Sequence, residues 1–359
     1  MAKNRRVGAL RLPVGRLHIE LTNRCNFSCE FCPDSRMVRA RGSMDFAMLS
    51  GILDEVSDKK IASTVFFHVM GEPLLYPRLV EGLSYASSKG LDTCVTTNGS
   101  LLSGQMLFAL AGAGVSKVIL SLQTPDAATF GHRGARGITF EEYSGKVIEA
   151  ARGAMSDGRV DLRISFLSSP LRRLIFPVMP QVSIADDTKS LKRHLSDWAD
   201  KILGGTKHEP LLKDFRSRLK WVSSFKNNSI RLGPNVSFDT RIMGDWAVHS
   251  IDDGIKARFG YCPAIQENLG ILWNGDVVFC CVDYEGKTAV GNLKDKTLEE
   301  CLARGQMQNA LKGFNMLRIT HPHCQRCIGD KNLLNAVVRQ VGSIIYFKGL
   351  RRLFPGTAA

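Results

Sequence analysis

The sequence predicts an α/β fold, namely a partial (β/α)6 barrel followed by a small α+β domain. Short apolar runs alternate with segments that carry apolar residues at helical spacing, from residue 16 to residue 167. Strands that alternate with helices in this way form βαβ units and a parallel sheet. Polar motifs follow the expected strands, as in barrels whose active site lies at the carboxyl ends of the strands. The pair Asn274-Gly275, between two short apolar runs, predicts a β-hairpin in the C-terminal third.

The order of elements divides the chain into several parts. We expect a basic N-terminal arm at 1–15, the barrel at 16–240, the small domain at 260–330 and a basic helical tail at 331–359. The segment 168–228 lacks a strand pattern, and we interpret it as a largely helical insertion that could cover the barrel mouth or project into solvent. The expected strands are 17–21, 63–69, 91–96, 116–122, 160–167 and 229–239, and the expected helices are 44–56 with Ser43 as N-cap, 77–88, 103–113, 140–155 and 297–311.

Composition limits the class of protein. The chain has 359 residues, of which 44% are hydrophobic and 23% are charged, as in ordinary soluble domains. No run of about 18 apolar residues predicts a spanning helix, and the basic N-terminus lacks the apolar region of a signal peptide. Ten cysteines in such a chain indicate metal binding and a reducing compartment, so we expect a cytoplasmic protein. The net charge of +14 fits nucleic acid, an anionic membrane or an acidic substrate, but a basic solvated surface is the commonest cause, and no nucleic-acid partner is expected.

The stretch 20–34 carries three cysteines, Cys25, Cys29 and Cys32, at C-x-x-x-C-x-x-C spacing. Three thiolates on one short loop can hold three irons of a cubane [4Fe–4S] cluster and leave the fourth iron open to bind and activate a ligand. A structural zinc site is the alternative, but zinc usually takes four ligands. No histidine follows the loop nearby, and His18 lies upstream in an expected strand. A disulfide framework suits a long chain without a signal peptide less well.

This cysteine motif resembles that of the radical S-adenosylmethionine (SAM) enzymes. In that family SAM binds the open iron through its amino and carboxylate groups. An electron from the cluster then cleaves SAM to methionine and a 5′-deoxyadenosyl radical. The resemblance therefore implies a SAM-binding [4Fe–4S] cluster, SAM itself and an electron donor such as flavodoxin or ferredoxin. Cofactors of this kind carry the chemistry, while the protein binds and orients them.

Turns after later strands also resemble motifs of this family. The turn 70–75 begins Met-Gly-Glu-Pro and is similar to the family's G-G-E-P motif, which binds the amino group of SAM, with Met70 in place of the first glycine. A carboxylate suits an ammonium group, and glycine lets the backbone approach closely. Thr97-Asn98-Gly99 is similar to the family's T-N-G turn, and later positions match its S-L-D and arginine–glycine pairs. The cofactor-binding residues that the resemblance implies are Gly71, Glu72, Pro73, Asn98, Ser121 and Arg133.

Two further residues carry open alternatives. Gln123 stands where the family usually has an acidic residue, so its role is left open. His68 shares a strand face with Phe66 and Met70 by period-2 alternation. It either reaches substrate inside the barrel or is an ordinary core histidine. No catalytic residue is assigned from the sequence.

A second group of cysteines lies in the C-terminal third. Four of them can ligate a [4Fe–4S] cluster fully, which leaves no open iron and favours electron transfer. The expected ligands are Cys262, Cys280, Cys324 and Cys327. The pattern resembles the twitch domain, the shortened form of the SPASM domain that holds an auxiliary cluster in radical SAM enzymes. Cys281 makes one ligand ambiguous, a four-cysteine zinc site is the alternative, and Cys94 and Cys301 are expected to be buried thiols.

These resemblances imply an enzyme that abstracts a hydrogen atom from an unactivated C–H bond. Twitch relatives with four such cysteines include a dehydrogenase of an aminocyclitol, so we expect oxidation of a small polar metabolite such as a sugar or cyclitol, with the auxiliary cluster as electron acceptor. Modification of a ribosomal peptide is the alternative, although only 24 residues precede Cys25. An enzyme of the molybdopterin-precursor type is expected less, because its auxiliary site uses three cysteines. A non-enzymatic zinc or iron–sulfur binding protein is the alternative of another class, and the turns at successive strand ends argue against it.

The tail from Asn332 to Pro355 mixes apolar with basic residues. A basic amphipathic helix can lie on an anionic membrane surface. Docking onto the barrel as an ordinary packed helix is the interpretation that we favour. The residues of interest are Leu333, Leu334, Val337, Val338, Val341, Ile344, Ile345, Tyr346 and Phe347 among the apolar ones, and Arg339, Lys348, Arg351 and Arg352 among the basic ones.

Overall fold

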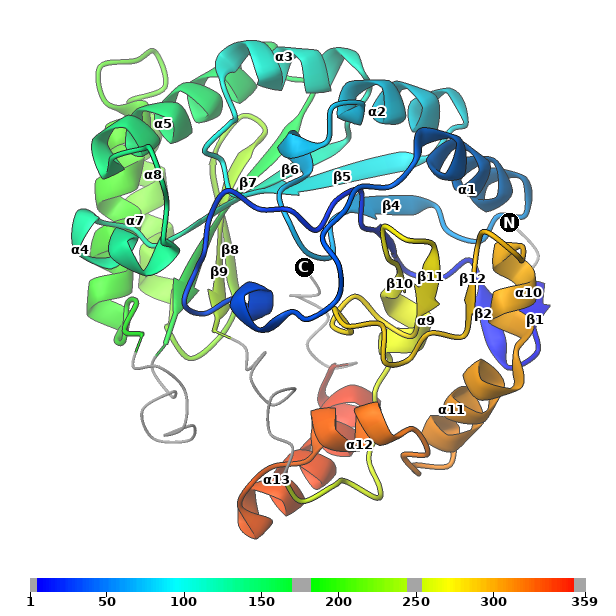
Figure 1. Cartoon of the computed structure of the whole chain (residues 1–359). Coiled ribbons are helices and arrows are strands. Elements are labelled where there is room, and N and C mark those ends of the chain that lie inside the picture. Colours follow the sequence, from blue (N-terminus) through cyan, green and yellow to red (C-terminus); the bar gives the residue numbers. More distant parts are fainter. Residues whose placement is uncertain (1–4, 170–181, 244–253, 352–359) are drawn as a thin grey trace.

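A twisted sheet of ten strands forms the frame of the molecule, in the order β12-β11-β10-β3-β4-β5-β6-β7-β9-β8. The computed structural model describes residues 5–169, 182–243 and 254–351. Strands β3, β4, β5, β6, β7 and β9 pair in parallel and form the wall of a partial barrel, with helices along its outer side (Figure 1). This is the partial (β/α)6 barrel that the alternating sequence pattern predicts.

The bounds of most elements lie within a few residues of those expected. The strands are β1 (Arg5–Val7), β2 (Leu10–Leu12), β3 (Leu17–Ile19), β4 (Thr64–Phe67), β5 (Asp92–Thr97), β6 (Lys117–Gln123), β7 (Asp161–Ser168), β8 (Asn228–Gly233), β9 (Val236–Ile242), β10 (Leu269–Ile271), β11 (Asp276–Val278) and β12 (Gly291–Asn292). The α-helices are α1 (Phe46–Asp58), α2 (Leu79–Ser88), α3 (Gly104–Gly112), α4 (Ala127–Phe130), α5 (Phe140–Asp157), α7 (Thr188–Leu203), α8 (Leu211–Arg218), α9 (Ala264–Glu267), α10 (Leu298–Ala303), α11 (Gly305–Asn315), α12 (Pro322–Ile328) and α13 (Leu333–Ile344). Short 3₁₀ helices are η1 (Pro33–Arg36), η2 (Pro73–Leu75), η3 (Gly131–Arg133) and η4 (Leu219–Trp221), and η6 (Ile345–Leu350) is a π-helical turn.

Two helix ends differ from the prediction for local reasons. Asp45, and not Ser43, caps α1, because its carboxylate accepts hydrogen bonds from two backbone N–H groups of the first turn at 2.9 and 3.3 Å. Ser43 instead donates its hydroxyl to that of Thr22 at 3.0 Å. The expected helix 297–311 is divided into α10 and α11, because Arg304 has a non-helical ψ of 142°.

The expected strand 229–239 is two strands and not one. Pro234 and Asn235, which has a φ of 54°, form a turn between β8 and β9. Proline has no N–H and a fixed φ, and a residue in the left-handed region cannot continue a strand. β8 therefore folds back antiparallel on β9, while β9 pairs in parallel with β7 as the sixth barrel strand.

The helices between β7 and β9 lie on the outer side of the barrel and not over its mouth. They continue the ring of helices beside α5 (Figure 1). The indole N–H of Trp198 on α7 donates to the carbonyl oxygen of Pro125 at 2.8 Å, and its ring meets that of Phe140 edge-on with the centroids 6.5 Å apart. A parallel β7–β9 pair requires such a crossover. The expectation of a covering insertion is therefore not met by its described helices, and 170–181 lies outside the described residues.

The C-terminal third joins the barrel through the sheet itself. β10 pairs in parallel with β3, with Gly270 opposite His18, and β11 and β12 follow as antiparallel strands. The hairpin turn at Asn274-Gly275 is formed as predicted, with Gly275 at a φ of 95°. The small domain is thus continuous with the barrel sheet.

The N-terminal arm is a folded hairpin. β1 and β2 pair antiparallel, and the side chain of Gln308 on α11 bonds to the arm at both ends of its turn. The amide of Gln308 donates to the carbonyl oxygen of Val7 at 3.0 Å, and its oxygen accepts from the N–H of Ala9 at 2.5 Å. The arm therefore belongs to the packed structure, and residues 1–4 lie outside the described residues.

The tail helix α13 docks by its polar side. Gln340 is buried, and its side-chain oxygen accepts hydrogen bonds from the N–H groups of Arg258 and Phe259 at 3.0 and 3.3 Å. The helix docks against residues 258–261 and α12, and not onto the barrel as expected. Its apolar side faces outward. The exposed apolar residues are Leu333, Leu334, Val337, Val338, Val341, Ile345, Tyr346 and Leu350. Within the described ranges, no helix has the length and apolar character needed to cross a membrane; residues 352–359 lie outside those ranges.

Replacement of Trp198 by alanine should lower the free energy of unfolding by roughly 3–5 kcal/mol, because the change leaves a cavity between α7 and the barrel. The side chain of Trp198 is 1% exposed, whereas that of Trp221 is 71% exposed, so Trp221→Ala is the matched control and should change stability little. Denaturant unfolding followed by circular dichroism measures both. Equal losses in the two variants would contradict the packing of α7 described above.

Candidate functional site

Three cysteine thiols lie on the loop that leaves the carboxyl end of β3. Cys25, Cys29 and Cys32 are all half-buried. The N–H of Cys32 donates to the carbonyl oxygen of Cys29 at 3.0 Å, which closes this part of the loop into a turn. The N–H of Glu30 donates to the carbonyl oxygen of His132 at 2.9 Å. The loop is therefore fixed both within itself and to the segment that follows β6; we call it the cluster loop.

The surroundings of these thiols disfavour bare thiolates. Burial raises the pKa of Cys25 to about 11 and that of Cys32 to about 12. Burial also raises the pKa of Cys29, although the guanidinium of Arg133 opposes this effect. A cysteine binds metal as the thiolate, so these three sulfurs need a bound cation to ionise at neutral pH. Three converging soft donors with this need fit three irons of a cluster.

Glu72 joins the turn after β4 to the turn after β5. Its side chain is 1% exposed, and Oε1 accepts hydrogen bonds from the Thr97 hydroxyl at 2.7 Å and from the N–H of Leu74 at 3.0 Å. Oε2 accepts from the N–H of Asn98 at 2.6 Å. Burial raises the pKa of Glu72, and these hydrogen bonds oppose the rise. The N–H of Glu72 donates to the carbonyl oxygen of Arg24 at 2.8 Å, so the carboxylate lies beside the cluster loop.

Gly71 allows the turn after β4 to touch the backbone of the cluster loop. Its φ is +80°, and a Cβ here would lie 2.4 Å from the carbonyl oxygen of Thr22 and 2.8 Å from that of Arg24. Any other residue would therefore push the loop away or strain the turn. Pro73 begins η2 directly after Glu72, where its missing N–H costs nothing.

Asn98 extends the connection to the first cysteine. Its side-chain amide donates to the side-chain oxygen of Asn26 at 2.8 Å and lies 3.8 Å from the sulfur of Cys25. Its side-chain oxygen accepts from the N–H and the hydroxyl of Ser100 at 2.9 and 2.7 Å. The amide of Asn26 donates back to the Ser100 hydroxyl at 2.8 Å. This closed network fixes the cluster loop to the end of β5.

Arg133 connects the end of β6 to the cluster loop. Its guanidinium is buried and donates to the carbonyl oxygen of Ser121 at 2.6 Å and to the side-chain oxygen of Gln123 at 3.2 Å. The guanidinium carbon lies 5.0 Å from the centre of the Phe27 ring, within the loop. Gln123, whose role the sequence left open, therefore supplies an acceptor for Arg133. Through these contacts Arg133 holds the cluster loop against the end of β6. Ser121 takes part through its carbonyl oxygen, which accepts the hydrogen bond from Arg133.

Glu20, directly after β3, is a buried carboxylate beside the candidate site that the sequence did not single out. Its carboxylate is fully buried and accepts hydrogen bonds from the N–H of Met70 and from the N–H of Trp273, each at 3.2 Å. Arg39 forms an ion pair with it. Burial raises the pKa of Glu20, and Arg39 opposes the rise. The available signal was a carboxylate directly after an apolar strand and just before the cysteine motif.

The second group of cysteines converges on Cys280. Cys324 and Cys327 lie about one turn apart on α12, and Cys262 precedes α9. Burial raises the pKa of Cys280, and the neighbouring thiols at Cys281, Cys262, Cys327 and Cys324 raise it further. Burial raises the pKa of Cys281 to about 11, although Arg16 and Arg241 of the barrel oppose the rise. The four expected ligands therefore lie together, while Cys281 lies toward the barrel.

The donor type of these groups bears on what they can hold. Each group offers cysteine sulfur, which is the ligand of iron–sulfur clusters. The residues present therefore fit a cluster by their chemistry.

Asp283 orders the loop beside the second cysteine group, and the sequence analysis did not identify it. Its fully buried carboxylate accepts from the N–H and the hydroxyl of Thr288, both at 2.6 Å. The ring of His323 lies 3.9 Å from the same carboxylate. His323 precedes Cys324, so the aspartate connects this loop to α12.

His18 and His68 face the barrel interior and are neutral at neutral pH. A ring nitrogen of His18 lies 3.2 Å from the carbonyl oxygen of His68. Burial lowers the pKa of His18 to about 4, and burial together with the nearby His18 and Arg241 lowers that of His68 to about 4. Neither ring therefore adds charge to the interior.

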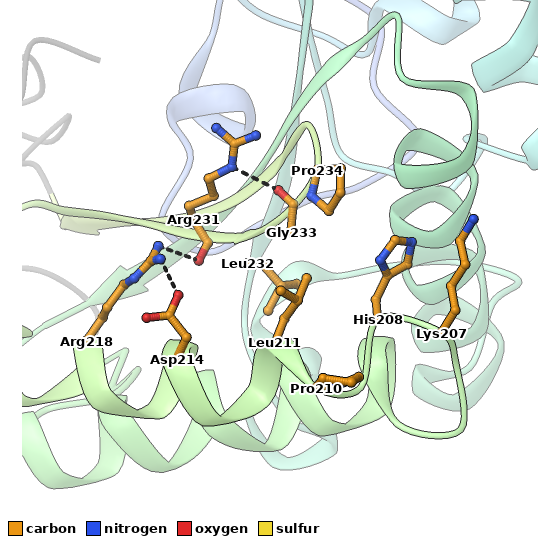
Figure 2. A pocket seen from close by; sticks show the side chains of 10 residues that line it. All are labelled: Lys207, His208, Pro210, Leu211, Asp214, Arg218, Arg231, Leu232, Gly233 and Pro234. Carbon is orange, nitrogen blue, oxygen red and sulfur yellow. Dashed lines mark hydrogen bonds and ion pairs between the residues drawn. The ribbon is translucent and has the colours of Figure 1, made fainter.

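A hollow of about 370 Å³ lies on the outside of the barrel, between α8 and the β8–β9 turn (Figure 2). Arg218 forms an ion pair with Asp214 and donates to the carbonyl oxygen of Arg231 at 3.5 Å. Arg231 in turn donates to the carbonyl oxygen of Gly233 at 3.3 Å. None of the cysteines or motif residues lines this hollow, so it takes no part in the candidate sites.

Two family models match the chain. Residues 19–163 match the radical SAM superfamily, and residues 262–328 match SPASM, an iron–sulfur cluster-binding domain. The first match runs from the end of β3 into β7, and the second begins at Cys262 and ends just after Cys327. Together they cover more than half of the chain and contain both cysteine groups.

Individual relatives match over shorter stretches. One relative is the tungsten-containing aldehyde ferredoxin oxidoreductase cofactor-modifying protein of Pyrococcus furiosus, which is 33% identical to this chain over 130 residues. The matched stretch covers 35% of this chain and 36% of that protein. The chain is 30% identical over 108 residues to the S-adenosyl-L-methionine-dependent 2-deoxy-scyllo-inosamine dehydrogenase of Niallia circulans, which covers 29% of this chain and 43% of that protein. The matches thus span less than half the length of these curated relatives.

The fold is also that of a solved structure. The crystal structure of Streptococcus suis SuiB bound to S-adenosylmethionine has a TM-score of 0.57 at 17% identity, and the likeness covers 86% of this chain and 69% of that one. At this identity the likeness shows the fold alone. The two matched domains imply a [4Fe–4S] cluster with SAM in the barrel and an auxiliary cluster in the C-terminal domain. The protein belongs to the radical SAM superfamily and carries a SPASM-type auxiliary domain.

Proposed function

We propose that the protein oxidises a C–H bond of a small polar metabolite, such as a sugar or a cyclitol. When bound, the cluster and SAM supply a 5′-deoxyadenosyl radical that removes a hydrogen atom. The observation that carries the proposal is the meeting of the turns after β3, β4 and β5 at one end of the barrel, where Glu72 and Asn98 bond them together beside Cys25. The relative of Niallia circulans, named as a dehydrogenase of a cyclitol amine, supports the class of substrate.

The proposed cluster ligands follow from the two cysteine groups. Cys25, Cys29 and Cys32 would hold the SAM-binding cluster and leave one iron open. The proposed ligands of the auxiliary cluster are Cys262, Cys280, Cys324 and Cys327. The choice of Cys280 over Cys281 is supported by its electrostatic contact with the other three ligands. We propose 16–240 as the barrel and 260–330 as the auxiliary domain.

The proposed SAM site uses the motif residues in different ways. A carboxylate offers about four acceptor positions, and the chain uses three of those of Glu72. The remaining position suits the ammonium group of SAM. Asn98 and Ser121 lie at neighbouring strand ends and can present polar groups to the cofactor. Gly71, Pro73 and Arg133 would act by shaping the site.

Cys262, Cys280, Cys324 and Cys327 would hold a cluster that could accept the electron of the substrate radical after hydrogen abstraction, while the substrate would release a proton. The pairing of β10 with β3 brings the auxiliary domain against the barrel. The bond from the N–H of Trp273 to Glu20 fixes it at the rim. A flavodoxin or ferredoxin is the proposed donor of the electron that the first cluster needs.

Modification of a ribosomal peptide remains the second candidate. The likeness to SuiB shows the fold alone and does not favour this candidate over a metabolite oxidation. Membership of the radical SAM superfamily removes the alternative of a non-enzymatic zinc or iron–sulfur binding protein. The two remaining candidates share the same first step and differ in the substrate.

Anaerobically reconstituted protein should contain about eight irons, as two cubanes. Replacement of Cys25, Cys29 and Cys32 by alanine should leave about four irons and abolish 5′-deoxyadenosine formation with dithionite and SAM, because the open iron is lost. Replacement of Cys324 and Cys327 should also leave about four irons but retain 5′-deoxyadenosine formation. Iron analysis and chromatography of the nucleoside products measure both quantities.

The matched controls are Cys94→Ala and Cys301→Ala, which remove buried thiols outside both groups and should keep about eight irons. About four irons together with stoichiometric zinc in the unmodified protein would show that the C-terminal site holds zinc. Unchanged 5′-deoxyadenosine formation in the first triple variant would refute the SAM-binding cluster.

Glu72→Gln should weaken SAM binding by about tenfold or more, because it removes the negative charge that faces the ammonium group while keeping the length of the side chain. Iron content should stay that of the unmodified protein, since Glu72 is not a proposed ligand. Equilibrium SAM binding to the reconstituted protein is the measurement. Glu81→Gln, on the exposed side of α2, is the control. Equal SAM affinity in the two variants would show that Glu72 only holds the turns together.

We also propose that the outward side of α13 contacts an anionic membrane surface. Its exposed apolar residues form one stripe along the helix. Isolated β-bridges join Ile255 to Asp330, just before α13, and Phe259 to Arg318, and Ile255 and Phe259 are themselves exposed. The exposed cations in these segments are Lys256, Arg258, Arg318, Lys331 and Lys348. An exposed apolar stripe together with exposed cations in the neighbouring segments suits anionic lipid headgroups.

The double variant Leu334→Asn and Val338→Asn should bind vesicles of phosphatidylglycerol and phosphatidylcholine several-fold more weakly than the unmodified protein, because it removes buried apolar area at the interface. Vesicles of phosphatidylcholine alone should bind both proteins weakly, and added salt should reduce binding. Co-sedimentation measures the bound fraction, and Val80→Asn on α2 is the control. If the double variant and the unmodified protein sediment equally, the contact does not involve α13.

A further inference from the structure

A cavity of about 430 Å³ lies inside the barrel, lined by the amino-terminal parts of β4, β6 and β7 and by the carboxyl half of β9. Arg16, Lys117, Arg163 and Arg241 line it from β3, β6, β7 and β9 or the residue just before them. The alternate residues of the same strands pack in the core under the helices, as Leu162 does on β7. Because side chains alternate across a strand, the cavity residues face the barrel interior.

Positive charge exceeds negative charge on this lining. Four of its residues are cations, and Asp239 is the one acidic residue among those described there. Arg163 already uses that carboxylate at 3.6 Å, together with Asp161 at 3.0 Å and the hydroxyl of Ser229 at 3.1 Å. The two neutral histidines of the interior add no charge. Asp161 lies opposite Lys117 in the parallel β6–β7 pair, and Asp239 acts on Arg241. Two carboxylates therefore stand against the four cations of the wall, which leaves an excess of positive charge.

Arg241 connects the cavity to the site at the other end of the barrel. It lies near the carboxyl end of β9, where its charge acts on His68. Its Nε is buried and has no hydrogen-bond partner. Burial lowers the pKa of Arg241, and Asp239 opposes this effect while Arg16 adds to it. A buried guanidinium in this state is stabilised by any anion that reaches it.

We propose that this cavity binds an anionic group of the substrate, of phosphate or carboxylate chemistry, with Arg241 and Lys117 as its main partners. The inference rests on the proposed function, because it takes the bound molecule to be the one whose C–H bond is oxidised. The planar guanidinium matches two oxygens of either group, and a multiply charged group offsets the excess of cations. The proposed substrate is then a sugar or cyclitol that bears a phosphate or carboxylate group.

Equilibrium binding of three probes to the reconstituted full chain at low salt tests the proposal. The probes are inorganic pyrophosphate, inorganic phosphate and malonate, measured by calorimetry. Arg241→Gln and Lys117→Gln should each weaken binding of the preferred probe by about tenfold. Stronger binding of pyrophosphate or phosphate than of malonate identifies a phosphoryl group, and the reverse order identifies a carboxylate.

The controls remove charge of the same kind elsewhere. Lys213→Gln and Arg193→Gln lie on exposed sides of α8 and α7 and should leave probe affinity unchanged. Asp239→Asn should instead increase the affinity several-fold, because it removes the opposing negative charge. A change that merely loosened the barrel would lower affinity, so the sign of this effect separates the two causes.

Two outcomes would overturn the proposal. One is the absence of binding of all three probes at millimolar concentration. The other is equal probe affinity in Lys117→Gln and Lys213→Gln, and this comparison decides even if Arg241→Gln fails to fold. Formation of 5′-deoxyadenosine by the unmodified protein is scored separately. Its absence alongside probe binding would refute the proposed function and leave the anion site standing.

Discussion

The buried carboxylate of Glu20 is the constraint on which the arrangement of both sites depends. Its partners come from three places: the turn after β4 at Met70, the segment after the cluster loop at Arg39 and the auxiliary hairpin at Trp273. A buried charge that loses its partner costs roughly 3–5 kcal/mol, so all three must be in place together. The barrel and the auxiliary domain therefore take up their positions as one unit.

Glu72 and Arg133 likewise connect separate segments through buried charged side chains, on the other side of the cluster loop. Glu72 and Arg133 direct most of their hydrogen bonds to the chain itself, and both touch backbone groups next to the cysteines. Such bonds hold the turns in place before a cofactor arrives, which reduces the ordering that binding requires. A motif known for binding SAM is thus also what fixes the geometry of the loop.

The sequence predicted what depends on local pattern and missed what depends on distant backbone groups. Alternating apolar runs predicted the barrel, and cysteine spacing predicted two groups that the fold brings together. The strand 229–239 was misread because its apolar pattern continues through Pro234. Glu20 was missed because its backbone partners lie about 50 and 250 residues away. For α13 the sequence left two orientations open, because the bonds from Gln340 to two N–H groups near residue 258 are not revealed by any periodicity.

The pairing of β10 with β3 has a consequence for how the chain reaches its folded state. β3 is an inner strand only because residues from 269 onward cover its free side. Until then it is an open edge, whose unpaired N–H and C=O groups can recruit a strand from another molecule. Contacts between residues so far apart in sequence also form slowly. The auxiliary domain therefore protects β3 from intermolecular strand pairing, in addition to carrying the second cysteine group. Aggregation through this edge is most favoured while the C-terminal third is still being synthesised.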